Sequence, residues 1–387
     1  MNRPLWGRFF RFRSPVQRAP GQEKSKEQKV SKDQRIPITI LTGFLGSGKT
    51  TMLNHWVHQP EMKDCAVLIN EFGSVGLDHE LVQQVDNSVV LLSSGCICCT
   101  LQSSFVNSLL DLFKKALRGE IPRFSRVVIE TTGLADPGSL LSIICYDQFV
   151  AQRFRYDGTV TVIDASHIRE QVKKQYESVK QIALADAVVI SKEDLVDKDE
   201  IAAIKEMSSR LNSAAPVYTA LNGDLSADIL KEIGPYQHGG IKDPKEISSW
   251  LRAESSDLGV ATVPVREVKK AGPGLGLLKK APISVHSDIS TFSMKFDKPL
   301  DGIKLMDALD AVTMQFGDSL LRVKGIINLT NSDQPIVIHG VYGDIYPTAT
   351  LDAWPEGKPS STIVFIARET VAKQMEALFR DILLNDY

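Results

Sequence analysis

One short motif limits the folds open to this chain more than any other feature. Residues 43–50 read GFLGSGKT and fill the pattern G-x-x-x-x-G-K-[S/T] without a mismatch. Residues 36–41 before it form a β-branched apolar run typical of a buried strand, and residues 51–58 after it favour a helix. Backbone N–H groups and the dipole of such a helix converge on an anion, so this order of elements predicts a phosphate-binding loop.

Further parts of a nucleotide site follow in chain order. We expect Lys49 to reach the β- and γ-phosphates and the Thr50 hydroxyl to bind Mg²⁺. The apolar run 127–130 reads as a strand that ends in Glu130, whose carboxylate can hold Mg²⁺ directly or through water. Gly133 comes three residues later and lets the backbone approach the γ-phosphate. These residues predict a nucleotide switch.

The base is indicated by a strand that ends in the residues SKED at 191–194. This ending is close to the N/T-K-x-D pattern of GTPases, with Ser191 keeping only a hydroxyl of the usual Asn or Thr. Asp194 can accept hydrogen bonds from N1–H and N2–H₂ of guanine, which adenine does not offer. We expect the stem of Lys192 to lie along the base. A charged helix start is the alternative; GTP, rather than ATP, is the predicted nucleotide.

Three of the five cysteines, Cys96, Cys98 and Cys99, stand in one C-x-C-C motif. Three thiolates on one turn supply at most three ligands, which suits an exchangeable metal site more than a closed structural one. Thiolates favour Zn²⁺, Cu⁺ or Co²⁺, while a packed turn or a redox-sensing dithiol are the alternatives. Cys65 and Cys145 stand alone in apolar surroundings, where we expect buried packing. The odd cysteine count is not typical of a disulfide framework and indicates a cytoplasmic protein.

Strands alternate with helices over residues 36–221, which predicts an α/β, P-loop NTPase domain with a mostly parallel sheet covered on both faces. Asp164 ends one strand at the edge where the phosphate loop lies, although a plain turn residue is the alternative. A looser connecting segment, 222–281, comes next. Residues 282–387 predict a small α+β domain. Its expected strands are 291–296, 321–329, 336–342 and 362–367, and its expected helices are 303–316 and 371–384.

The charge pattern sets limits on partners. Residues 1–35 contain several arginines and no acid before Glu23, which predicts a basic disordered arm, with a transit peptide as the alternative. A net charge of −2 gives no electrostatic reason to bind nucleic acid. No stretch is long and apolar enough to span a membrane. We therefore expect neither nucleic acid nor membrane as a partner, and a homo-oligomer remains possible.

Taken together, these motifs resemble those of the CobW-like P-loop GTPases, with the bacterial YjiA type as the most similar. The shared motifs are GFLGSGKTT at 43–51, NEFG at 70–73, GCICCT at 95–100, ETTGLADP at 130–137 and SKED at 191–194. The resemblance extends over roughly residues 36–370. It implies a CobW-type C-terminal domain at 282–387 and the activity of a nucleotide-dependent metallochaperone, linked in many members to zinc.

The resemblance also implies a role for each matching residue. The nucleotide would be bound by Gly43, Gly46, Ser47, Gly48, Lys49, Thr50, Thr51, Gly133, Lys192 and Asp194. Catalysis falls to Lys49, Glu71 and Glu130, Mg²⁺ to Thr50 and Glu130, and the transition metal to Cys96, Cys98 and Cys99. The chain departs from the family at Ser74 and Ile69, where members can carry acids. The metal site would then depend more on thiols, and on Asp78 or His79.

The predicted function is that of a GTP-hydrolysing metallochaperone that passes zinc, or another transition metal, to an apo-metalloprotein client under nucleotide control. Such control requires that the metal bind the GTP and GDP states with different affinity. One alternative is a nucleotide-gated metal or redox sensor that delivers nothing. The other alternative is an ATP-dependent maturation factor.

Overall fold

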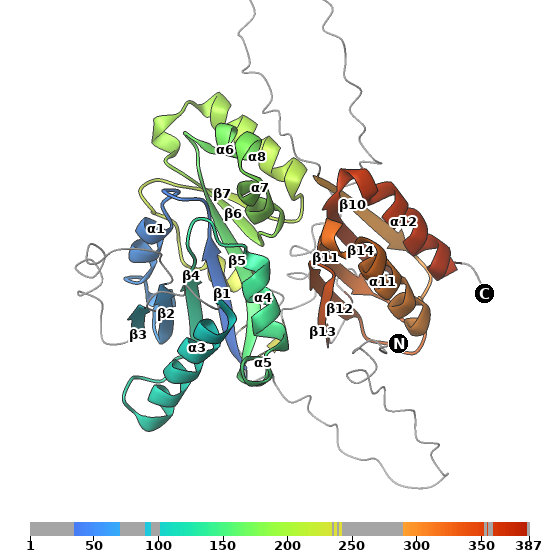
Figure 1. Ribbon diagram of the computed structural model, residues 1–387, viewed down its shortest axis with the longest axis horizontal. Helices are drawn as coiled ribbons and strands as arrows, with labels where there is room; N and C mark the ends of the chain where they lie inside the picture. The colour runs from blue at the N-terminus through green and yellow to red at the C-terminus, as the bar shows by residue number, and fades with distance from the viewer. Residues whose placement is uncertain are drawn as a thin grey trace, which may run out of the picture. The chain divides into compact units, whose positions relative to one another are not determined.

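The computed structural model describes residues 35–69, 90–93, 101–233, 236–237, 240–241, 289–351, 354 and 359–384. Two large sheets organise these residues (Figure 1). The first consists of β1 (Ile36–Thr42), β2 (Cys65–Ile69), β3 (Val90–Ser93), β4 (Arg126–Glu130), β5 (Phe154–Asp164), β6 (Ala187–Ser191) and β7 (Val217–Ala220). Its helices are α1 (Lys49–Trp56), α3 (Leu101–Arg118), α4 (Pro137–Tyr146), α5 (Gln148–Arg153), α6 (Ile168–Lys174), α7 (Tyr176–Ala183), α8 (Lys198–Leu211) and the short α9 (Ile229–Glu232).

The first sheet has the strand order β3-β2-β4-β1-β5-β6-β7, and every neighbouring pair is parallel. The predicted α/β fold is therefore confirmed, with a sheet that is entirely parallel among the described strands. β1 lies in the middle, between β4 and β5. The carboxyl ends of these three strands consequently meet at one edge, where ligands bind in open α/β sheets.

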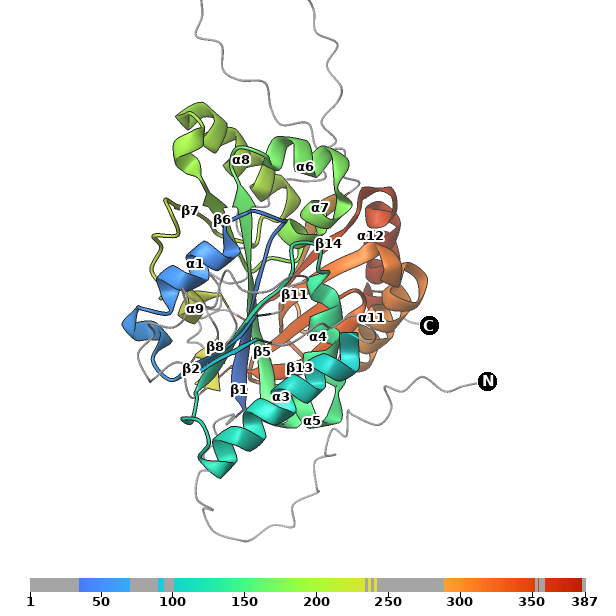
Figure 2. The ribbon, with the colours of Figure 1, turned by 60° about the vertical axis from the view of Figure 1, so that its left-hand side comes forward.

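Apolar side chains cover both faces of this sheet, as a parallel sheet requires. On β4, Val127 and Ile129 enter the core under α3 to α8, whereas Val128 enters the core under α1 and α9. Figure 2 shows α1 and α9 on one side of the strands and α3, α4 and α5 on the other. Burial on both sides explains why the strand sequences read as continuous apolar runs instead of alternating ones.

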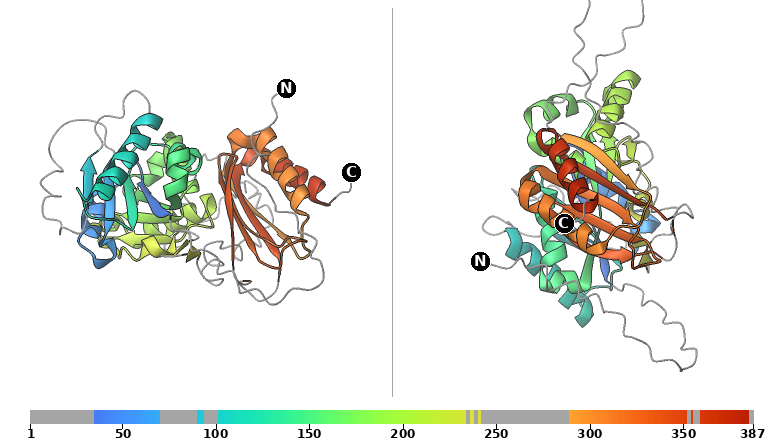
Figure 3. Two further views of the ribbon diagram at one scale, coloured as in Figure 1. Left: turned by 90° about the horizontal axis from the view of Figure 1, so that it is seen from below. Right: turned by 90° about the vertical axis from the view of Figure 1, so that its right-hand side faces the viewer.

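The second sheet is antiparallel, in the order β10-β14-β11-β12-β13. Its strands are β10 (Ile289–Phe296), β11 (Leu320–Ile327), β12 (Ile336–Val341), β13 (Asp344–Thr350) and β14 (Ser361–Arg368), and its helices are α11 (Gly302–Phe316) and α12 (Glu369–Leu384). Both helices lie on one face (Figure 3), where Phe365 meets Phe379 of α12 edge to face at 5.2 Å. This confirms the predicted C-terminal α+β fold.

Several boundaries differ from the sequence-based expectations. β13 was not expected because Pro347 interrupts its sequence. A proline is tolerated at this place because β13 is an edge strand of its sheet. β2 was also not expected, since a run of five apolar residues can be read as strand or helix. Helix α1 begins at Lys49, two residues earlier than predicted. The segment expected to be a loose connection contains α9 and a short hairpin of β8 (Tyr236–Gln237) and β9 (Gly240–Ile241).

The two sheets are joined by a buried charge cluster. Asp186, just before β6, accepts a hydrogen bond from the Tyr156 hydroxyl and pairs with Arg322 and with Lys324 Nζ, the latter at 2.9 Å. Both cations come from β11. The imidazole of His339 stacks on the Tyr156 ring at 5.4 Å.

No helix among the described residues is long and apolar enough to cross a membrane.

Candidate functional site

The phosphate loop joins β1 to α1 at the central edge of the parallel sheet. Gly43 has φ +142°, and a Cβ there would lie 2.1 Å from the Val162 carbonyl oxygen of β5. Only glycine fits this close passage. Gly46 and Gly48 also have positive φ. The Ser47 hydroxyl inside the turn is buried and has no hydrogen-bond partner among the described residues, as expected of a group that awaits a ligand.

Lys49, in the first turn of α1, places its ammonium inside the same loop. Its side chain is almost fully buried, and Nζ donates hydrogen bonds to the carbonyl oxygens of Gly43 at 2.9 Å and Phe44 at 3.1 Å. A cation at a helix N-terminus opposes the helix dipole unless an anion joins it. The loop therefore has the charge and shape to hold phosphate.

Thr50 and Glu130 are separated by 80 positions in the chain and meet behind the loop. The Thr50 hydroxyl donates a hydrogen bond to Glu130 Oε1 at 2.6 Å, and Glu130 is only 1% exposed. A hydroxyl and a carboxylate are oxygen ligands of the kind that Mg²⁺ prefers. The two side chains are therefore suitable ligands for the Mg²⁺ that the sequence analysis predicted at Thr50 and Glu130.

The segment after Glu130 packs directly on the phosphate loop. A Cβ on Gly133 would lie 2.4 Å from the Leu45 amide nitrogen, so the two backbones touch at this position. Gln181 of α7 fixes the segment from the other side, because its Nε2 donates to the carbonyl oxygens of Gly133 and Ala135, both at 3.2 Å. No motif near Gln181 predicts this role, because the contacts join residues 48 and 46 positions apart in the chain.

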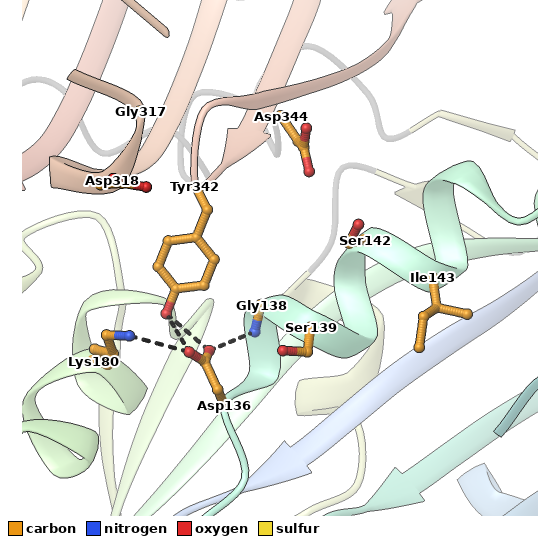
Figure 4. A pocket seen from close by; sticks show the side chains of 10 residues that line it. All are labelled: Asp136, Gly138, Ser139, Ser142, Ile143, Lys180, Gly317, Asp318, Tyr342 and Asp344. Atoms are coloured by element: carbon orange, nitrogen blue, oxygen red, sulfur yellow. Dashed lines mark hydrogen bonds and ion pairs between the residues drawn. The ribbon is translucent and has the colours of Figure 1, made fainter. Parts of the chain in front are cut away.

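Asp136 ties the end of this segment to the second sheet. Its carboxylate accepts from the Gly138 amide at 3.0 Å, from the Tyr342 hydroxyl at 2.8 and 3.0 Å, and from Lys180 Nζ at 3.2 Å. Figure 4 shows Tyr342, which follows β12, pointing at Asp136 beside a cavity of about 680 Å³. Burial raises the pKa of Tyr342, so its hydroxyl stays a donor. Any movement of Asp136 therefore strains a contact with the C-terminal domain.

Lys192 and Asp194, the residues predicted to read the base, directly follow β6, whose end lies beside the end of β5. The Ser191 hydroxyl lies 2.6 Å from the Ser47 carbonyl oxygen and thus connects this end of the site to the phosphate loop. Lys192 Nζ donates to Asp164 Oδ2 at 2.7 Å. Asp194, in a 3₁₀ turn, is exposed. The structure thus brings the predicted base-reading and phosphate-binding residues to one edge.

The metal motif is not part of the described chain. Glu71, Ser74, Asp78, His79 and the cysteines 96, 98 and 99 all lie outside the described residues. Within the described ranges, no group of three or more His, Cys, Asp or Glu residues could hold a metal ion. Cys65 is buried, as predicted, and burial raises the pKa of its thiol to about 11. Cys145 is half-buried, and burial raises its pKa as well.

Comparison with known families gives two matches along the chain. The family described as CobW/HypB/UreG, nucleotide-binding domain, matches residues 37–219. The cobalamin synthesis protein CobW C-terminal domain matches residues 289–383. The first match contains the phosphate loop and all of the parallel sheet except one residue at each end, and the second contains the antiparallel sheet and its two helices except the last residue of α12.

Individual relatives agree with these matches. The zinc chaperone YjiA of Escherichia coli is 29% identical over 344 residues, which cover 89% of this chain and 98% of YjiA. The zinc-regulated GTPase metalloprotein activator 1 of Schizosaccharomyces pombe is 34% identical over 232 residues, 58% of this chain and 54% of the relative. The crystal structure of Zn(II)-bound YjiA GTPase matches with a TM-score of 0.63 at 26% identity and covers 90% of this chain and 99% of that one.

Proposed function

Because the chain belongs to the CobW-like family of P-loop proteins, we propose that it binds and hydrolyses GTP and delivers zinc to an apo-metalloprotein client under nucleotide control. The observation that carries this proposal is the meeting of Thr50 and Glu130 behind a loop that already holds the Lys49 ammonium. Zinc is favoured over Co²⁺ and other transition metals because relatives of this chain are zinc chaperones and zinc-regulated GTPases.

The residues of the site divide the work of nucleotide binding. The backbone of the loop and Lys49 bind the phosphates, and Asp194 accepts the hydrogen bonds of the guanine edge. Mg²⁺ held by Thr50 and Glu130 would supply positive charge beside the phosphate groups. Gly133 lets the following segment approach the loop, so this segment can sense whether a γ-phosphate is present.

Metal release follows from the switch. The C-x-C-C thiolates come after the NEFG segment in the chain, and Glu71 of that segment is proposed to order against the γ-phosphate. When GTP is hydrolysed, the NEFG segment loses its contact with the γ-phosphate. We propose that this change alters the spacing of the thiolates and therefore the affinity of the protein for zinc. Since Ser74 and Ile69 replace possible acidic ligands, the thiolates carry most of this affinity. In this proposal zinc is the ion that is delivered, and GTP hydrolysis controls when it is released.

The test is zinc release during turnover. Reduced protein loaded with one equivalent of Zn²⁺ is mixed with 4-(2-pyridylazo)resorcinol, and colour is followed after adding GTP, GDP, ATP or a non-hydrolysable GTP analogue. Delivery predicts that GTP changes the release rate and that the analogue does not reproduce the full effect. A sensor predicts binding without turnover-dependent release, and an ATP-dependent maturation factor predicts that ATP acts in place of GTP.

A further inference from the structure

Both oxygens of the Asp164 carboxylate accept hydrogen bonds, next to the residues predicted to read the guanine base. Asp164 is the last residue of β5, and its side chain is 4% exposed. Oδ1 accepts from the Ser166 amide at 2.8 Å and the Ser166 hydroxyl at 2.6 Å. Oδ2 accepts from Lys192 Nζ at 2.7 Å and His167 Nδ1 at 3.0 Å. Although burial raises the pKa of Asp164, the hydrogen bonds from Lys192, Ser166 and His167 lower it overall, so the group is ionised.

Lys192 is constrained at its other end too. Its backbone has φ 55° and ψ 37°, the left-handed conformation that a non-glycine residue seldom adopts. Strained backbone of this kind persists where surrounding contacts enforce it, and it gathers at functional sites. The preceding residue, Ser191, contacts the Ser47 and Ile163 carbonyl oxygens. The stem of Lys192 is therefore stretched between the end of β6 and the end of β5.

We propose that Asp164 is a positioning residue for the nucleotide base: it holds the stem of Lys192 extended before GTP arrives, so that the base packs on a preformed surface. The proposal rests on the GTP-binding function proposed above. A free lysine side chain has many rotamers, and ordering it on binding lowers affinity. Pre-ordering by Asp164 removes that loss, which is the general benefit of a preorganised site.

The main variant is Asp164→Asn, which keeps the shape of the side chain and removes its charge. Lys192 is partly exposed, so solvent screens the ion pair, and we expect GDP binding to weaken about three- to tenfold. The stem contacts a ring face that guanine and hypoxanthine share. The ratio of GDP to inosine diphosphate affinity should therefore stay at the wild-type value, whereas Asp194→Asn should change it.

A double-mutant cycle separates positioning from a general structural effect. Lys192→Met keeps a long apolar stem without the ammonium, and it should weaken GDP binding by a similar factor. In that background Asp164→Asn should add little, because the interaction that it removes is already absent. Ser166→Ala is a graded variant, since it removes one donor to Oδ1 of the same carboxylate but leaves the Ser166 amide and the Lys192 ion pair in place. It should weaken GDP binding less than Asp164→Asn does.

Binding of fluorescent N-methylanthraniloyl GDP, and its displacement by unlabelled GDP or inosine diphosphate, measures these affinities. The melting temperature of each nucleotide-free variant reports on folding. Additive losses in the cycle, unchanged binding by Asp164→Asn, or tighter binding because the pair must break would each overturn the proposal. If Asp164→Asn does not fold, unchanged binding by Lys192→Met overturns it instead. A wild-type protein that binds no guanine nucleotide would refute the proposed function itself, which is a different result.

Discussion

At the scale of single residues, the account depends on the 2.6 Å contact between the Thr50 hydroxyl and Glu130. Thr50→Ala removes the hydroxyl ligand proposed for Mg²⁺ and leaves the helix intact, so GTP turnover should fall on the order of 100-fold. Thr50→Ser keeps the hydroxyl and should retain most of the activity. Phosphate release at saturating GTP and Mg²⁺ measures both. Wild-type turnover by Thr50→Ala would show that this contact has no part in catalysis.

Asp194 provides the residue-scale test of base choice. Asp194→Asn replaces an acceptor by an amide, so the contact to N2–H₂ of guanine is lost and GDP should bind at least about 100-fold more weakly. Xanthine carries an acceptor oxygen at that position, which the amide can satisfy. Xanthosine diphosphate should therefore bind the variant better than GDP does. Titration with both nucleotides checks this reversal, and an unchanged preference for GDP would place guanine recognition elsewhere.

At the scale of elements, Gly138 in the first turn of α4 lies against Tyr342. A Cβ on Gly138 would lie 1.9 Å from Tyr342 Cε2, so Gly138→Ala must displace the ring and its contact with Asp136. We expect a loss of about 1–3 kcal/mol in the free energy of unfolding, as for other overpacked sites. Thermal or denaturant unfolding measures this loss.

The matched control for this prediction removes the ring. In a Tyr342→Ala background the clash is absent, and alanine favours a helix over glycine. There the same Gly138→Ala change should be neutral or stabilising. A similar destabilisation in both backgrounds would mean that the effect comes from α4 itself and not from its contact with the second sheet.

Sequence reasoning succeeded where the signal is local. Lys49, Thr50 and Glu130 follow from short motifs, and the structure places all three at one loop. It failed where two distant segments had to be paired. Nothing near Tyr342 indicates that its hydroxyl binds Asp136, 206 positions away, and the pairing of Lys192 with Asp164 required the strand order. Asp164 was placed at the correct edge of the sheet, but its partner was not identified.

At the scale of the whole molecule, the buried cluster around Asp186 makes stability depend on pH. Burial, reinforced by the charge of Arg322, holds the pKa of His339 well below its ordinary value, so the folded protein keeps this imidazole neutral. The unfolded chain binds a proton at pH values below about 6.5. Since the unfolded state gains the proton, stability is present above that pH and is lost as the pH falls. The loss expected at pH 5.5 is about 1.4 kcal/mol.

Asp186 extends the same trend to stronger acid. Burial alone would raise the pKa of Asp186, but the charges of Arg322 and Lys324 lower it far below its ordinary range. Its stabilising effect is therefore present at neutral pH and is lost as the pH falls below about 4, where the unfolded carboxylate takes up a proton. The free energy of unfolding should thus decrease with falling pH in two successive ranges, first near the ordinary pKa of histidine and then near that of aspartate.

Denaturant unfolding of the nucleotide-free protein at pH 7.5 and 5.5 checks the histidine part of this trend. His339→Gln cannot titrate, so its unfolding free energy should change less between the two pH values, whatever its absolute stability. Equal pH dependence in the wild type and the variant would contradict the assignment to His339.

The most direct test of the whole account is the zinc affinity of reduced protein with a GTP analogue, with GDP and without nucleotide. Coupled sites predict a several-fold difference in Kd between the states, and Cys98→Ser should abolish the tight binding. Cys145→Ala, which removes a half-buried thiol outside the motif, should behave as the wild type. One zinc affinity in all three states would show that the nucleotide and metal sites act independently, and delivery under nucleotide control would be wrong for this protein.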